Sequence, residues 1–127
     1  MLVILVRHAQ AAPGQPDELR PLTPSGREAA QLLGDLLAER SPDAIVSSPL
    51  LRARETAALL AGAASLEPTV DDGLAPGATA EKLRLAVAGL GETVIAVGHQ
   101  PDCSEIVLEL TGREISFPTA AFAELEL

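Results

Sequence analysis

The sequence predicts an α/β fold, a three-layer sandwich in which a mostly parallel central sheet carries helices on both faces. Short apolar segments alternate along the chain with longer segments whose apolar residues recur at helical spacing, as in helices that pack on a sheet. The 127 residues can enclose one core but not two, and no repeat or linker divides them. We therefore expect a single domain over residues 1–127.

The N-terminal part of the chain predicts a buried strand, a loop and a helix, in that order. Residues 2–6 are apolar at every position and rich in β-branched side chains, which is typical of a strand covered on both faces. Residues 11–22 contain three prolines and one glycine, so we expect a loop. Thr23 and Pro24 supply a capping side chain and a proline at the first helical position, which predicts a helix from there to about Arg40.

The middle of the chain repeats this alternation. Residues 44–47 predict a second short strand, and the Ser48-Pro49 pair that follows predicts the start of a second helix with Gly62 near its end. A weaker apolar stretch over residues 66–70 predicts a third strand. This order places a helix between consecutive strands, as the crossover connections of a parallel sheet require.

The C-terminal part predicts two more helices and two more strands. Residues 79–88 are typical of a helix, and residues 93–97 form the clearest strand after the first. Another helix is expected to start at Pro101 and to stop at Gly112. Residues 120–127 end in an alternation of apolar and polar side chains, which predicts a last strand at a sheet edge, where it can run antiparallel to its neighbour.

Composition and charge disfavour several classes of partner. The formal net charge of −9 opposes binding to nucleic acid or to an anionic membrane surface, and the chain has no Trp or Tyr on which bases could stack. Cys103 is the only cysteine, so no internal disulfide can form, and its place on an apolar helix face predicts a core residue. We see no targeting segment or membrane span in the sequence and expect a cytoplasmic protein.

Histidines and arginines follow three of the predicted strands. Arg7 and His8 come directly after the first strand. Arg52 comes shortly after the second strand, and His99 follows the strand over residues 93–97. The carboxyl ends of parallel strands meet at one edge of the sheet, where α/β folds bind their ligands. An arginine in the first turn of a helix costs about 0.3–1 kcal/mol because the helix dipole is positive there, unless an anion is bound. The pattern therefore predicts an anion-binding site.

Four stretches resemble, in content and order, the motifs of the histidine phosphatase superfamily, also called the phosphoglycerate-mutase-like family. They are Arg7-His8-Ala9, Leu-Thr-Pro-Ser-Gly at residues 22–26, residues 47–56, and Val-Gly-His-Gln-Pro at residues 97–101. Together they span nearly the whole chain. The short length and the Arg-Pro-Leu-Thr stretch at residues 20–23 resemble the SixA branch, which consists of phosphohistidine phosphatases.

This resemblance implies a phosphatase without a cofactor. His8 would be the nucleophile that takes a phosphoryl group from the substrate and passes it to water. Arg7, Arg52 and His99 match phosphate-binding positions of the family. Guanidinium groups pair with phosphate oxygens, and a protonated His99 would add a hydrogen-bond donor. Arg20 is expected to line the same pocket. No metal is expected, because two histidines without a carboxylate cluster make a poor site and Arg7 would repel a cation.

The general acid is left open among three carboxylates. The resemblance to SixA favours Asp17, just before the stretch at residues 20–23, and Glu18 and Asp72 are the alternatives. Each of them could instead be a solvated loop residue. A weak acid would suffice for a phosphohistidine substrate, because an imidazole leaving group needs less protonation than an alkoxide.

The substrate is expected to be a phosphorylated side chain of another protein. Residues 70–94 hold one predicted helix and little else, so no long insertion can fold over a small molecule. An open pocket suits phosphohistidine on a signalling or carrier protein. One alternative is a general phosphomonoesterase of the same superfamily that acts on small phosphate esters. Another is a non-catalytic module that binds phosphate or phosphopeptides. Phosphomutase activity is not expected without the usual acid and lid.

Overall fold

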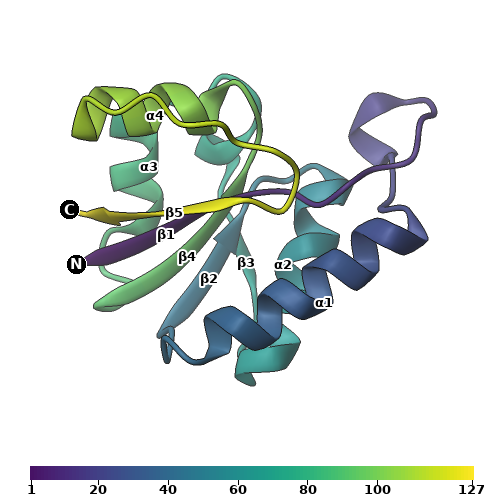
Figure 1. Ribbon diagram of the computed structural model, residues 1–127, viewed down its shortest axis with the longest axis horizontal. Coiled ribbons are helices and arrows are strands. Elements are labelled where there is room, and N and C mark those ends of the chain that lie inside the picture. The colour runs from purple at the N-terminus through teal and green to yellow at the C-terminus, as the bar shows by residue number, and fades with distance from the viewer.

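The computed structural model describes all of residues 1–127 and consists of one five-stranded sheet between two layers of helices (Figure 1). The strand order is β3-β2-β4-β1-β5. Four neighbouring strands run parallel, and only β5 is antiparallel to its neighbour β1. The strands are β1 (Leu2–Arg7), β2 (Ala44–Ser47), β3 (Thr69–Val70), β4 (Thr93–Gly98) and β5 (Phe122–Glu126). The predicted three-layer α/β architecture is confirmed.

The helices divide into two pairs, one on each face of the sheet. Helices α1 (Pro24–Ala38) and α2 (Leu51–Ala64) pack against each other and cover one face, whereas α3 (Ala80–Val87) and α4 (Asp102–Thr111) cover the other (Figure 1). Two short 3₁₀ turns, η1 (Asp17–Leu19) and η2 (Asp72–Leu74), lie in the connections. No helix of the chain combines the length and the hydropathy that crossing a membrane would take.

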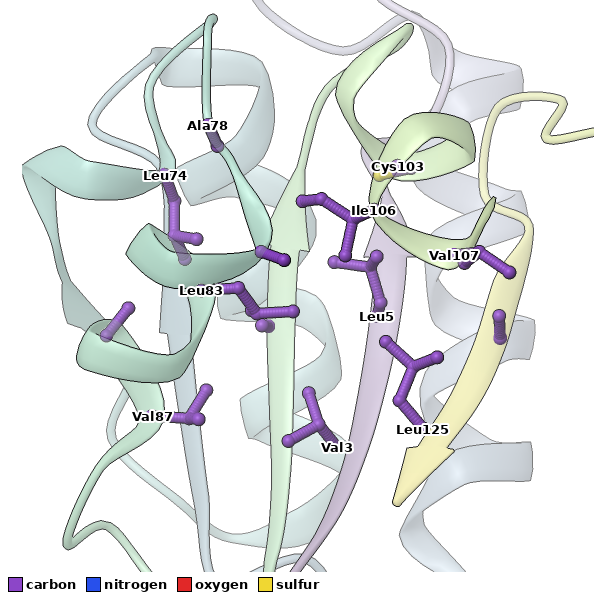
Figure 2. Packing of buried hydrophobic residues seen from close by; sticks show 14 of the residues in the cluster. Val3, Leu5, Leu74, Ala78, Leu83, Val87, Cys103, Ile106, Val107 and Leu125 are labelled. Carbon is purple, nitrogen blue, oxygen red and sulfur yellow. The ribbon is translucent and has the colours of Figure 1, made fainter. Parts of the chain in front are cut away.

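Strand β1 lies in the middle of the core and is buried on both faces. Val3 and Leu5 belong to the hydrophobic cluster under α3 and α4, where Leu83 and Ile106 meet them (Figure 2). Ile4 and the other alternate residues of β1 belong to the cluster under α1 and α2. Burial of each such side chain contributes about 1.5–3 kcal/mol, which explains why residues 2–6 are apolar without exception. The same burial fixes the strand end from which Arg7 and His8 emerge.

Helix α1 begins at the residue that its capping signal predicts. The hydroxyl of Thr23 accepts the backbone N–H of Gly26 at 3.0 Å, and Pro24 occupies the first helical position. Gly26 lies directly against the segment that follows β1, because a Cβ atom at this position would overlap the carbonyl oxygen of Gln10. That carbonyl also accepts the N–H of Thr23 at 3.0 Å. The start of α1 is therefore held close to the residues after His8.

Two predicted boundaries differ from the structure. Helix α2 begins at Leu51 and not at Ser48-Pro49, and its N-cap residue Leu50 makes no side-chain capping bond. The hydroxyl of Ser48, the predicted cap, accepts the N–H of Leu50 at 3.2 Å and contacts His99, but the first helical backbone bonds are accepted by the carbonyl of Leu50. Strand β3 is only two residues long and exposed, since it lies at a sheet edge and has only β2 as a neighbour.

The last strand and the lone cysteine lie where the sequence places them. Strand β5 pairs with β1 at the sheet edge, and its alternation puts Ala123 and Leu125 in the core and Glu124 and Glu126 in solvent. Cys103 is buried in the cluster under α4 (Figure 2), and burial raises the pKa of its thiol to about 12. This thiol is a core group and not a nucleophile.

Candidate active site

The carboxyl ends of β1 and β4 bring the only two histidines of the chain together. These strands are adjacent and parallel, with Arg7 opposite Gly98 in the register, so the residues that follow them lie side by side. The ring centroids of His8 and His99 are 5.3 Å apart, and the ring planes are inclined by 58°. Their exposed fractions are only 8% and 3%. Two buried imidazoles in this arrangement need polar partners, and these partners define the state of each ring.

His8 is held in the state that a nucleophile needs. Its Nδ1 lies 2.7 Å from the carbonyl oxygen of Ala9. A carbonyl oxygen can only accept, so Nδ1 carries the proton and Nε2 of the neutral ring has a free electron pair. Burial lowers the pKa of His8 below its ordinary value, and the guanidinium charges of Arg52 and Arg7 lower it further. At neutral pH the ring is therefore uncharged, with Nε2 available for attack.

The residue that orients His8 is itself anchored to helix α2. The backbone N–H of Ala9 donates to the hydroxyl of Thr56 at 3.0 Å, and that hydroxyl donates to the carbonyl oxygen of Arg52 at 2.8 Å. Thr56 has no exposed surface. It thus connects the segment after β1 to the helical turn that carries Arg52. No role for Thr56 was predicted from the sequence, although it lies one helical turn after Arg52, the spacing at which a hydroxyl reaches the carbonyl four residues back.

Three arginines contribute positive charge that acts on His8. Arg52 is buried, and its guanidinium donates to the backbone oxygen of Asp17 at 2.9 Å and to its carboxylate at 3.3 Å. Arg7 donates to the carbonyl oxygen of Phe117 at 3.0 Å, while its Nε is buried without a partner. Arg20 donates to Asp17 at 2.9 Å and to a backbone oxygen of the same loop. The charges of all three arginines lower the pKa of His8, with Arg52 contributing the most of the three.

His99 differs from His8 in which ring nitrogen has a partner. Its Nε2 lies 2.7 Å from the hydroxyl oxygen of Ser48, whereas its Nδ1 is buried and has none. Burial lowers the pKa of His99 to about 4, and the neighbouring His8 and Arg52 add to this effect. His99 is therefore neutral at pH 7, and the protonated donor that the resemblance implies is not its resting state.

Of the three candidate acids, only Asp17 contacts the site. Its carboxylate forms ion pairs with Arg20 at 2.9 Å and with Arg52 at 3.3 Å. The hydrogen bond from Arg20 lowers the pKa of Asp17 most, and the charge of Arg52 adds to it. A carboxyl group that gives up its proton this readily is a poor general acid. Glu18 is exposed in the same turn, and Asp72 is exposed in η2, which packs against α3.

The site is built to receive an anion. The charges of Arg7, Arg20 and Arg52 act on His8, and those of Arg7 and Arg52 act on His99 as well. Two buried nitrogens, Arg7 Nε and His99 Nδ1, have no hydrogen-bond partner within the protein. Donors of this kind match the oxygens of a phosphoryl group. The side chains do not form any group of three or more His, Cys, Asp or Glu residues that could hold a metal ion. The arrangement supplies a nucleophilic nitrogen and positive charge at the same place.

Residues 3–76 match the family model of the histidine phosphatase superfamily (branch 1), and the chain belongs to this superfamily. An uncharacterized protein of Picosynechococcus sp. strain PCC 7002 is 36% identical over 117 residues, covering 84% of this chain and 71% of the relative. The segment that matches the family model, residues 3–76, contains Arg7, His8 and Arg52 but ends before His99. The place of His99 in the site therefore rests on the geometry of β4.

Solved structures of the SixA type share this fold over nearly the whole chain. The protein histidine phosphatase SixA complexed with tungstate has a TM-score of 0.88 at 27% identity, over 100% of this chain and 88% of that one. A structure from Agrobacterium tumefaciens assigned as phosphohistidine phosphatase SixA has a TM-score of 0.83 at 30% identity, over 97% and 89%. A mycobacterial glucosyl-3-phosphoglycerate phosphatase shares the fold alone, with a TM-score of 0.76 at 20% identity over 97% and 88%.

Proposed function

We propose that this protein is a metal-independent phosphatase in which His8 takes a phosphoryl group from the substrate and passes it to water. The observation that carries the proposal is the 2.7 Å contact between His8 Nδ1 and the Ala9 carbonyl, which leaves Nε2 unprotonated among three guanidinium groups. The Nε2 electron pair forms a bond to phosphorus, and the bond to the leaving group breaks with its electron pair. Water then attacks phosphorus, the bond to Nε2 breaks, and phosphate leaves.

The positive charges around His8 would act on the transition state. In phosphoryl transfer, negative charge is spread over the equatorial oxygens, and catalysis depends mostly on positioning and electrostatic stabilisation. Arg7 and Arg52 are buried or half-buried, so their interaction with these oxygens is weakly screened by water. Arg20 is more exposed and is expected to contribute less.

We further propose that the substrate is phosphohistidine on a partner protein. The ionised state of Asp17 supports this choice, because an imidazole leaving group depends less on a strong acid than an alkoxide does. The shape of the site supports it too. The two surface cavities, of about 210 and 170 Å³, contain neither His8 nor His99, and only η2 and α3 lie between β3 and β4. So short a connection leaves little chain to fold over a small molecule, which suits a side chain presented by another protein. We further propose that this phosphatase acts in the cytoplasm.

The experiment compares wild type with His8→Ala on a phosphohistidine peptide and on para-nitrophenyl phosphate. Phosphate release is followed together with acid-labile phosphoryl label on the protein. Turnover and label in wild type only would support His8 as the nucleophile. Faster turnover of the peptide supports phosphohistidine as the substrate, and faster turnover of the ester favours the general phosphomonoesterase. If neither substrate turns over and no label forms, the protein is a phosphate-binding module.

A further inference from the structure

The hydroxyl of Ser48 lies between the second histidine of the site and the start of helix α2. Ser48 follows β2, has no exposed surface, and places its Oγ 2.7 Å from Nε2 of His99. The backbone N–H of Leu50 donates to the same oxygen at 3.2 Å. The position that the sequence predicts as a helix cap therefore contacts the imidazole.

The hydrogen bonds of Ser48 determine which way its proton points. Because the Leu50 N–H already donates to Oγ, the hydroxyl proton needs an acceptor of its own. The only other partner of this side chain is Nε2 of His99. A buried hydroxyl proton without an acceptor is unfavourable, so the hydroxyl donates to Nε2. A nitrogen that accepts a hydrogen bond carries no proton, and the single proton of the neutral ring then lies on Nδ1.

We propose that Ser48 is a positioning residue that fixes neutral His99 with its proton on Nδ1, so that this N–H donates to an oxygen of the phosphoryl group held at His8. Nδ1 is the only ring nitrogen of His99 without a partner, it is buried, and the ring that carries it lies 5.3 Å from the ring of His8. The reverse assignment, with a proton on Nε2, would turn a lone pair instead of a donor toward the phosphoryl oxygens. The role toward phosphate rests on the function proposed above, whereas the tautomer does not.

His8 and His99 therefore have opposite roles, and their hydrogen-bond partners determine which role each has. Both rings carry the proton on Nδ1. In His8 this nitrogen is occupied by the Ala9 carbonyl, which leaves the electron pair of Nε2 to attack. In His99 the hydroxyl of Ser48 occupies Nε2, which leaves the N–H of Nδ1 to donate. His99 can therefore bind a phosphoryl oxygen without first taking up a proton.

The test is ¹⁵N nuclear magnetic resonance of the histidine-labelled chain at neutral pH, which shows only four ring nitrogens because there are two histidines. We expect a protonated Nδ1 and an unprotonated Nε2 for His99 in wild type, and a mixture of the two tautomers in Ser48→Ala. The matched control is Ser47→Ala, since Ser47 is equally buried but its hydroxyl donates to the carbonyl oxygen of Ser48 at 2.9 Å and not to His99. The control should keep the wild-type tautomer.

Inorganic phosphate tests the second half of the proposal. Adding it should shift the Nδ1 signal of His99 in wild type, and Ser48→Ala should lower kcat by about tenfold or more, since loss of one donor to a transition state costs up to 10³-fold. A proton on Nε2 in wild type, an unchanged tautomer in Ser48→Ala, or an Nδ1 signal that phosphate does not move would overturn the proposal. A phosphate-induced shift without turnover of any substrate would refute only the proposed phosphatase activity and would support the role of Ser48.

Discussion

Replacing Thr56 with valine removes one hydroxyl and keeps the shape of the side chain. In the structure this hydroxyl accepts the N–H of Ala9 at 3.0 Å and donates to the Arg52 carbonyl at 2.8 Å, in a position closed to solvent. The N–H of Ala9 would lose its partner, which costs about 1–3 kcal/mol of unfolding free energy. At about 4 °C per kcal/mol for a domain of this size, Tm should fall by roughly 4–12 °C.

The catalytic effect of this substitution should exceed its effect on folding. Ala9 supplies the carbonyl that orients His8, and misplacement of a reacting group by about 1 Å can cost on the order of 100-fold in rate. We therefore expect Thr56→Val to lower kcat by about 10- to 100-fold at a temperature where it is fully folded, with little change in KM. Thr56→Ser keeps the hydroxyl and should restore most of kcat.

A second threonine, whose hydroxyl also donates to the carbonyl four residues back, provides the control. Thr111 in α4 donates to the Val107 carbonyl at 2.7 Å and accepts the N–H of Arg113 at 3.1 Å, outside the site. Thr111→Val should leave kcat at the wild-type value. The comparison uses thermal unfolding and steady-state kinetics on the same samples. If Thr56→Val loses stability but keeps full kcat, Thr56 serves folding alone and the coupling to His8 is wrong.

Five further outcomes are expected. Arg52→Ala should lower kcat/KM by roughly 10²–10³-fold, while Arg54→Ala, an exposed arginine two positions away, should change it little in the same assay. Because the pKa of His8 is lowered, kcat/KM should stay high as the pH falls through about 6.5, the ordinary histidine value, and an acid limb at or above that pH would contradict the neutral nucleophile. Since the pKa of His99 is about 4 in the folded state, the unfolded state binds its proton first, so the free energy of unfolding should fall between about pH 6.5 and 4 in a urea titration. Asp17→Asn should lower turnover of a phosphohistidine peptide by less than about tenfold, and a much larger loss would establish Asp17 as the acid. Dialysis against EDTA should leave turnover unchanged, and a large loss would establish a bound metal.

Local signals in the sequence predicted most of the fold. The apolar run of β1 and the cap-plus-proline signal of α1 are each written in a few neighbouring residues, and the structure confirms both. The start of α2 was predicted wrongly by the same kind of signal. Ser48 has the composition of a cap, but its hydroxyl contacts His99, 51 residues away. A local rule cannot detect this contact with a residue so distant in the sequence.

The candidate site was predictable in its residue types but not in its protonation states. The ends of the predicted strands identify His8 and His99, because the carboxyl ends of parallel strands lie at the same edge of the sheet. The neutral state of both rings depends on burial and on partners that come from distant segments, such as the hydroxyl of Ser48. The pKa of Asp17 is lowered first by the hydrogen bond from Arg20, three residues away, and the charge of Arg52 adds to this effect across 35 residues. Only the folded chain brings these charges together.

Gly26 shows that the Leu-Thr-Pro-Ser-Gly stretch matters for packing and not for catalysis. None of these five residues carries a group that could transfer a proton or bind phosphate strongly, yet the stretch accompanies the histidine motif. Because the backbone of Gln10 fills the space where a side chain would begin, a glycine at this position lets α1 lie in direct contact with the residues that follow His8. An engineer could redesign the solvent-exposed face of α1, where Leu32 is two-thirds exposed, without moving the active site. At Gly26 the smallest added carbon would displace the helix or the residues that follow His8.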